Sequence, residues 1–297
     1  MRKMKLLTYV ANGEYRLGAL VGEDRVLDLR AADPLLPQEM VLLIAAGGEV
    51  LDRIRALLDS PQQDMLRPLE GMVLTAPIPR PQKNIFCVGR NYKEHILEGA
   101  RARGVEVAFP PVPEFFTKPT TAVIGPEAGI ERHGAYTDQL DYEVELAVII
   151  GRRSRDIAVG EALDSVFGYT IVNDVSARDR QRAHGQWFKG KSYDSFCPIG
   201  PWIVTADEFG RPENHRLSLT VNGQTRQDST TSDLLFSVPE IIAHLSAGLT
   251  LEAGDVIATG TPSGVGMGMI PQVWLRVDDV VEARIEGIGI LRNTVIP

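Results

Sequence analysis

The chain has 297 residues, of which 44% are hydrophobic and 24% charged, a composition typical of globular proteins. The formal net charge is -8 and the sequence pI is about 5.3, with no dense run of Lys and Arg. This acidity argues against a nucleic-acid or anionic-membrane partner. No apolar run reaches membrane-spanning length, and the N-terminus does not resemble a signal peptide. Cys87 and Cys197 are too few for a disulfide framework, so we expect a cytoplasmic protein in which both cysteines are packing residues.

The first part of the chain predicts a small α/β domain, residues 1–76. Residues 6–10 and 16–21 have the composition of strands joined by a turn at Asn12-Gly13, and residues 26–29 indicate a third strand. Apolar residues at helix-like intervals predict a helical stretch over residues 37–58. A Pro-rich linker at residues 77–81 then marks the boundary.

Residues 77–297 predict a second, larger domain with a different pattern. Short β-branched runs alternate with Gly and Pro, at residues 84–88, 143–150, 166–173, 202–204, 217–221 and 256–259. The clearest late helix covers residues 238–245. No βαβ rhythm is sustained, so we expect an α+β fold that is mainly β rather than a doubly wound sheet.

Two glutamates, Glu143 and Glu145, stand two residues apart in a predicted strand with an apolar far end. Side chains at i and i+2 share one face of a strand, so the two carboxylates are expected side by side on a half-buried face. Such a pair is tolerated mainly when a cation neutralises it or when its members share a proton. The pair therefore predicts part of a site for a hard cation.

Asp174 supplies a third carboxylate, after the predicted strand at residues 166–173. We expect it to begin a helical turn, which would place Arg178 and Gln181 on its own face at i+4 and i+7. Two Glu and one Asp without His or Cys suit Mg²⁺ or Mn²⁺ better than Zn²⁺. The alternative is that Asp174 only caps a helix and Arg178 is a surface charge.

Three further segments carry candidate chemistry. Lys189 and Lys191 lie among aromatic residues and could bind an anion or stabilise an enolate, or could form a solvated turn. The Gly-rich turn at residues 254–266 could bring backbone N–H groups and the Thr261 hydroxyl to a small carboxylate, or be purely structural. His95 and Glu98, at i and i+3, would meet on a short helix as an acid/base dyad, although such spacing also arises by chance. The polar, Pro-rich residues 99–113 could then form a mobile lid.

These motifs, in this order, resemble the fumarylacetoacetate hydrolase superfamily from about residue 80 to the C-terminus. The resemblance rests on Asn91-Tyr92 with His95 and Glu98, Phe116 with Lys118-Pro119, residues 141–146, residues 173–181, residues 191–194 and residues 259–266. It implies a mixed β-sandwich roll that forms a homodimer, preceded by the small N-terminal domain of many bacterial members. It also implies one Mg²⁺ or Mn²⁺ per subunit, held by Glu143, Glu145 and Asp174. His95 and Glu98 match the dyad that activates water, and Lys191 matches the lysine that stabilises an enolate. The expected substrate-binding residues are Arg90, Tyr92, Lys118, Arg178, Gln181 and Thr261.

The resemblance favours hydrolysis of the C–C bond of a 2,4-diketo acid to pyruvate and a carboxylic acid. The nearest alternative is a decarboxylase or isomerase of oxaloacetate or of 2-hydroxymuconate-type acids, which would use the same metal and enolate chemistry. A catalytically silent acid- or sugar-binding module is a third possibility, against which the His95–Glu98 dyad argues. Substrate choice is expected to depend on the lid and on loops near Tyr136 and residues 267–269.

Overall fold

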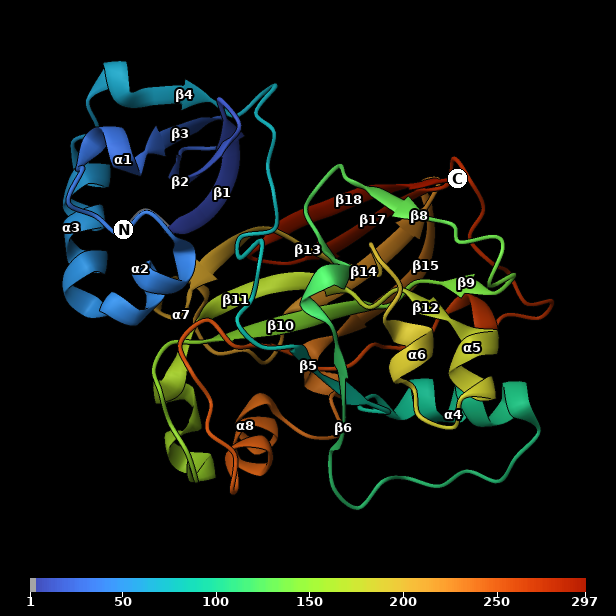
Figure 1. Ribbon diagram of the computed structural model, residues 1–297. Helices are drawn as coiled ribbons and strands as arrows, with labels where there is room; N and C mark the ends of the chain where they lie inside the picture. Colours follow the sequence, from blue (N-terminus) through green and yellow to red (C-terminus); the bar gives the residue numbers. More distant parts are fainter. Residues whose placement is uncertain (1–3) are drawn as a thin grey trace.

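The computed structural model describes residues 4–297 and is built on an 11-stranded sheet, which a smaller sheet covers (Figure 1). The strand order of the large sheet is β4-β3-β2-β1-β13-β11-β10-β16-β5-β6, and β7 pairs with β13. In chain order its strands are β1 (Lys5–Ala11), β2 (Glu14–Val21), β3 (Arg25–Asp28), β4 (Leu66–Pro68), β5 (Ile85–Gly89), β6 (Glu114–Lys118), β7 (Val123–Ile124), β10 (Val144–Ile150), β11 (Val166–Asn173), β13 (Cys197–Thr205) and β16 (Val256–Ala258). The expected α+β, mainly β fold is confirmed.

The smaller sheet has five strands in the order β15-β14-β17-β18-β8. These are β8 (Gly129–Glu131), β14 (Arg216–Val221), β15 (Gln224–Thr230), β17 (Val280–Ile285) and β18 (Gly289–Ile296). Two short strands, β9 (Leu140–Asp141) and β12 (Ser176–Ala177), pair separately. Hydrophobic side chains of the two main sheets share one buried cluster, which is the sandwich core.

Strand β10 is buried along its whole length, and its two faces serve different cores. Leu146, Val148 and Ile150 pack in the sandwich core, while Ala147 and Ile149 pack in a second cluster with the N-terminal helices. Glu145 belongs to the face of Ala147 and Ile149, because side chains alternate along a strand. The N-terminal elements therefore cover the far end of the face that carries the carboxylates.

The N-terminal region contains the predicted hairpin, β1 and β2, whose turn residues Asn12 and Gly13 both have positive φ. The helical stretch predicted over residues 37–58 is confirmed for most of its length, but it is divided in two. Two helices, α2 (Met40–Ala46) and α3 (Gly48–Asp59), meet at Gly47, whose φ of 75° breaks the helical path. The predicted third strand also ends one residue early, since Leu29 begins the short helix α1 (Leu29–Ala32). Strand β1 pairs with β13, so the N-terminal strands continue the large sheet.

Helices α4 (Lys93–Arg103), α5 (Arg178–Ala183) and α6 (Phe188–Lys191) lie together at one end of the molecule (Figure 1). The segment suggested as a mobile lid, residues 99–113, begins as helix, because α4 continues to Arg103. The helix ends at Gly104, whose φ of 63° forms the C-cap. The remaining helices are α7 (Ala206–Phe209) and α8 (Val238–Ser246), and α8 confirms the late helix. Within residues 4–297, no helix is long and apolar enough to cross a membrane.

Candidate active site

Three buried carboxylates meet where β10 begins and β11 ends. The antiparallel register pairs Glu145 with Val172, and its extension by one residue beyond Val144–Asn173 sets Glu143 opposite Asp174. The Asp174 N–H donates to the Glu143 carbonyl at 2.8 Å and continues this pairing. Residues opposite each other on antiparallel strands share a face, as do residues two apart on one strand. One oxygen from each carboxylate therefore lies within 4.8 Å of the other two.

The predicted trio is thus brought together, and Glu143 and Glu145 share a face as their spacing predicted. Asp174 joins them through the antiparallel register rather than through a helical turn. Glu143 precedes β10 rather than lying in it, and Asp174 begins no helix. Helix α5 starts at Arg178 with Ala177 at its N-cap, so the expected helical turn from Asp174 is wrong. The alternative is wrong as well, because Asp174 caps no helix and Arg178 is buried. Arg178 and Gln181 do lie together on α5, since Nη1 of Arg178 donates to Oε1 of Gln181 at 3.2 Å.

Buried cations neutralise two of the three carboxylates. Lys191 Nζ lies 2.7 Å from Glu143 Oε2 and 2.6 Å from Asp174 Oδ2, and Arg178 Nη2 lies 2.5 Å from Glu143 Oε1. Lys118 donates to the other oxygen of Asp174 and to the Val175 carbonyl. Burial alone would raise the pKa of Glu143, but the charges of Arg178 and Lys191 hold it below its usual range. Burial opposes the charge of Lys191, yet Asp174 and Glu143 raise its pKa.

Glu145 differs, because within residues 4–297 it forms no ion pair. Its carboxylate accepts one backbone hydrogen bond, from Gly260 N–H at 2.8 Å. Burial, followed by the charges of Asp174 and Glu143, raises the pKa of Glu145 well above its usual value. A buried carboxylate without a cation, beside two others, fits a divalent ion bound by oxygen ligands, as Mg²⁺ and Mn²⁺ prefer.

The loop after β16, residues 259–268, holds carboxylates of the protein itself. Gly260, Gly264 and Gly266 donate their N–H groups to Glu145, Glu98 and Asp141. The Gly-rich turn therefore positions side chains of the site through its backbone. The Thr261 hydroxyl is likewise engaged, since it donates to the Val144 carbonyl at 3.0 Å and accepts from Gln227 at 2.8 Å.

The predicted dyad lies on α4 beneath this loop. His95 Nδ1 is 3.5 Å from Glu98 Oε2, and this buried nitrogen has no hydrogen-bond partner in the structure. Both oxygens of Glu98 accept the Gly264 N–H, at 3.0 and 3.2 Å. A Cβ on Gly268 would come within 2.2 Å of Glu98 Oε1, so only glycine allows this close approach. Glu98 is thus held in place beside the imidazole of His95.

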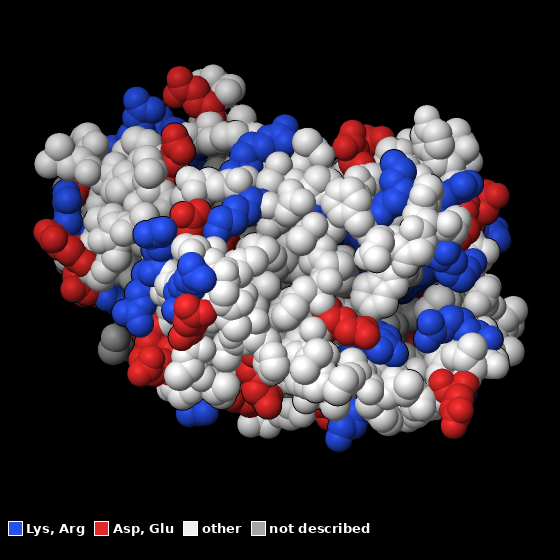
Figure 2. Space-filling view, turned by 60° about the horizontal axis from the view of Figure 1, so that its bottom comes forward, with Lys and Arg blue, Asp and Glu red and all other residues white. Residues whose placement is uncertain are grey.

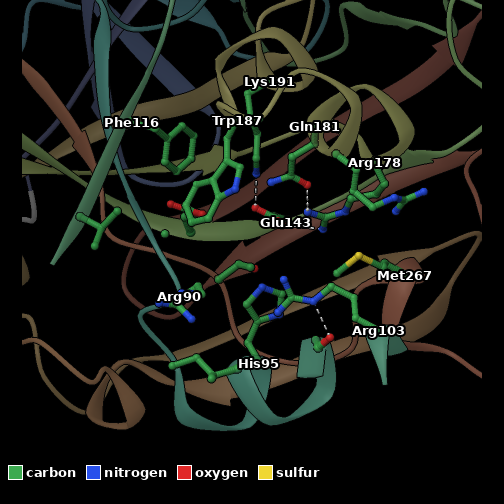
Figure 3. A pocket seen from close by; sticks show the side chains of 18 residues that line it. Arg90, His95, Arg103, Phe116, Glu143, Arg178, Gln181, Trp187, Lys191 and Met267 are labelled. Atoms are coloured by element: carbon green, nitrogen blue, oxygen red, sulfur yellow. Dashed lines mark hydrogen bonds and ion pairs between the residues drawn. The ribbon is translucent and has the colours of Figure 1, made fainter. Parts of the chain in front are cut away.

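A cavity of about 280 Å³ opens between α4, α5 and α6 (Figure 3). Of the predicted site residues, those lining it are Arg90, His95, Glu143, Glu145, Arg178, Gln181, Lys191 and Thr261. Tyr92, Glu98, Lys118 and Asp174 are buried outside this lining. Met267 lines the cavity as expected, whereas Tyr136 is exposed elsewhere and stacks on Tyr193.

Several residues of the site carried no role in the sequence-based prediction. Asp141 accepts from Arg178 Nε at 2.8 Å and from Gly266 and Met267 N–H at 2.7 and 3.0 Å. Asp141 lies two residues before Glu143 and four before Glu145, and this alternate spacing could have predicted that it lies near them. Trp187 and Arg103 also line the cavity, and the position of Arg103 eight residues after His95 places both on one face of α4.

Fold and site together define a mainly β protein with a buried carboxylate centre suited to a divalent cation. The family model described as fumarylacetoacetate (FAA) hydrolase C-terminal matches residues 84–296. The chain belongs to the fumarylacetoacetate hydrolase family.

Relatives extend the similarity over the full chain. Oxaloacetate tautomerase YisK of Bacillus subtilis is 41% identical over 304 residues, covering 98% of this chain and 100% of that protein. The solved structure of a fumarylacetoacetate hydrolase from psychrophilic Exiguobacterium antarcticum is 41% identical, with a TM-score of 0.83 and 99% of each chain covered. A maleylpyruvate hydrolase from Sphingobium sp. SYK-6 is 32% identical, with a TM-score of 0.79 and 99% of each chain covered.

Proposed function

We propose that this enzyme interconverts the keto and enol forms of an oxaloacetate-type 2-oxo acid with the help of Mg²⁺ or Mn²⁺. The observation that carries the proposal is the 41% identity to an oxaloacetate tautomerase over essentially both full chains. The geometry agrees, because the imidazole of His95 lines the same cavity as two of the three carboxylates, Glu143 and Glu145. Of the activities weighed from the sequence, this supports isomerisation, which belongs to the alternative, over C–C hydrolysis.

Each residue of the site has a distinct role in the proposed reaction. Glu143, Glu145 and Asp174 would hold the ion, which would supply Lewis-acid stabilisation of the negative charge that develops on the substrate. His95 Nδ1 faces Glu98, so Nε2 is the nitrogen left to take a proton from C3 of the keto form or return it to the enol. Lys191, charged and buried beside Glu143, adds positive charge where the 2-oxygen becomes negative. One proton leaves C3 and one is gained at the 2-oxygen, so composition is unchanged.

C–C hydrolysis is the second candidate, favoured by the 32% identity to a maleylpyruvate hydrolase. It would use the same His95–Glu98 pair to take a proton from water instead of from carbon. The two activities differ in their products, because hydrolysis of an acylpyruvate releases pyruvate and tautomerisation releases nothing.

The test follows the ultraviolet absorbance of freshly dissolved enol-oxaloacetate, with Mg²⁺, Mn²⁺ or a chelator. We expect metal-dependent loss of the enol without CO₂ release, and about a hundredfold or greater loss of rate in His95→Asn. His244→Asn, an exposed residue of α8, is the matched control. Pyruvate release from acylpyruvates without enol turnover would replace the proposal with the hydrolase.

A further inference from the structure

We propose that Arg103 and Arg182 bind a second, distal carboxylate of the substrate, and so select short dicarboxylic 2-oxo acids. This inference rests on the proposed function for the reaction, but the binding preference it describes can be measured without turnover. It begins with the charges that line the cavity.

Most cations of the cavity already have carboxylate partners. Arg90 pairs with Glu114 at 2.6 and 2.7 Å, Arg178 pairs with Asp141 and Glu143, and Lys191 pairs with Glu143 and Asp174. Within residues 4–297, Arg103 and Arg182 are the lining arginines that form no ion pair.

Arg103 is held at the cavity by its own helix. His95, Gly99 and Arg103 follow each other at intervals of four, and all three line the cavity from one face of α4. The Arg103 side chain folds back so that Nε donates to the Gly99 carbonyl at 2.9 Å, and Figure 3 shows it directed into the cavity. A Cβ at Gly99 would stand 3.7 Å from Arg103 Nη2, so the guanidinium lies directly along this glycine. This bond occupies Nε and leaves the Nη groups for a ligand.

Arg182 approaches from the other wall, one helical turn after Arg178 on α5. Its Nη2 donates to the amide oxygen of Gln139, a neutral acceptor. Arg103 and Arg182 are both exposed. Figure 2 shows basic side chains on the right of the face, the end that carries α4 and α5, and also on its left. Both guanidinium groups line the cavity and are bound only to neutral acceptors, so each remains available to a carboxylate at the rim.

Two aromatic side chains, Phe116 and Trp187, limit the size of the cavity. Trp187 packs edge-to-face on Phe116 at 5.5 Å between ring centres, and a Cβ on Gly89 would meet the indole at 2.0 Å. A volume of about 280 Å³ is at the small end for ligand cavities. One end of the substrate would face the three carboxylates and their ion, and the other end the arginines, which favours a short acid charged at both ends.

The experiment compares two ligands that do not react. With Mg²⁺ present, calorimetry measures binding of 3,3-difluoro-oxaloacetate, which has the distal carboxylate and cannot enolise, and of oxalate, which lacks the distal group. We expect Arg103→Gln and Arg182→Gln each to weaken the binding of difluoro-oxaloacetate about tenfold. Each should weaken the binding of oxalate less than about twofold. Arg101→Gln, on the same helix but outside the cavity lining, should change neither.

Equal weakening of both ligands, no weakening of either, or no binding of difluoro-oxaloacetate by the unmodified protein would overturn the inference. A kinetic comparison separates it from the proposed function. Hydrogen–deuterium exchange at C3 of 2-oxobutyrate, which has one carboxylate, should be unaffected by Arg103→Gln, while turnover of enol-oxaloacetate falls about tenfold. If the unmodified protein lacks tautomerase activity but the two arginine variants still selectively lose binding of difluoro-oxaloacetate, the proposed function is rejected and the carboxylate site is retained.

Discussion

The backbone N–H of Gly260 donates to Oε2 of Glu145 at 2.8 Å, and within residues 4–297 this is the one hydrogen bond that the Glu145 carboxylate accepts. Its neighbours Glu143 and Asp174 are contacted by lysine and arginine. Of the three carboxylates, Glu145 is therefore the one that no positively charged side chain contacts within residues 4–297. A divalent cation should add most stability there.

Glu145→Gln should separate cation binding from folding. At a hundredfold excess over its Kd, a bound ion stabilises the folded state by about 2.7 kcal/mol, so Mg²⁺ or Mn²⁺ should raise the Tm of the unmodified protein. The variant should lose most of this shift, while its Tm in chelator stays equal or rises, because a neutral amide replaces a buried carboxylate. Scanning fluorimetry with and without metal measures both effects. Glu49→Gln, an exposed change on α3, should keep the shift, and a full shift in Glu145→Gln would exclude Glu145 as a ligand.

Asp141→Asn should destabilise the protein although Asp141 lies outside the three-carboxylate cluster. The change removes one of the negative charges that face buried Arg178. It also weakens the hydrogen bonds that residue 141 accepts from the Gly266 and Met267 N–H groups. Breaking a buried ion pair from one side costs roughly 3 kcal/mol or more. Urea unfolding at pH 7 measures the loss. Asp138→Asn, whose side chain is 94% exposed beside Arg132, should cost under about 0.5 kcal/mol. Similar small losses in both variants would contradict the structural role of Asp141.

Gly89→Ala should act through Trp187. The added Cβ would lie 2.0 Å from Cζ3 of the indole, so the ring must leave its place on Phe116. We expect about a tenfold loss of kcat/KM and a change in indole fluorescence, and little further effect of the same change in a Trp187→Ala background. Neighbouring residues that share a contact are commonly non-additive by about 1 kcal/mol or more. Additive effects in the four-variant cycle would show that the alanine disturbs something other than Trp187.

Asp28 should make stability depend on pH in the N-terminal region. Burial alone would raise the pKa of Asp28, but hydrogen bonds from Arg16 and from Ala31 N–H outweigh it and lower the pKa. Since the unfolded value is about 3.9, the carboxylate stabilises the fold above that pH, and its contribution is lost as pH falls through the lower folded value. Asp28→Asn should therefore be less stable by about 1 kcal/mol at pH 7, and the gap should close below about pH 3.9. Urea unfolding across this range is the measurement, with exposed Asp59→Asn as control; a constant gap would refute the assignment.

Local patterns predicted many elements because their causes are local. The run at residues 166–173 coincides with β11, and the helix at residues 238–245 forms α8, whose N-terminus has a capping box between Ser237 and Glu240. The helical stretch predicted across residues 37–58 forms as two helices, because Gly47 has a positive φ that the apolar periodicity does not reveal. The helical turn predicted from Asp174 is wrong for a different reason: the chain just after Asp174 forms β12, which pairs with the distant strand β9 through Ser176 with Asp141 and Ala177 with Leu140.

By itself the sequence determined the chemistry that is present: three carboxylates, an imidazole beside a glutamate, and a buried-strand pattern that brings Glu143 and Glu145 to one face. Tertiary structure alone decided how the charges are distributed. It pairs Lys118 and Lys191 with Asp174, leaves Glu145 with a backbone donor, and leaves Arg103 and Arg182 with neutral acceptors. The reason is physical: an ion pair forms only between groups that the fold brings within a few ångströms, and the partners here lie 17 to 56 residues apart.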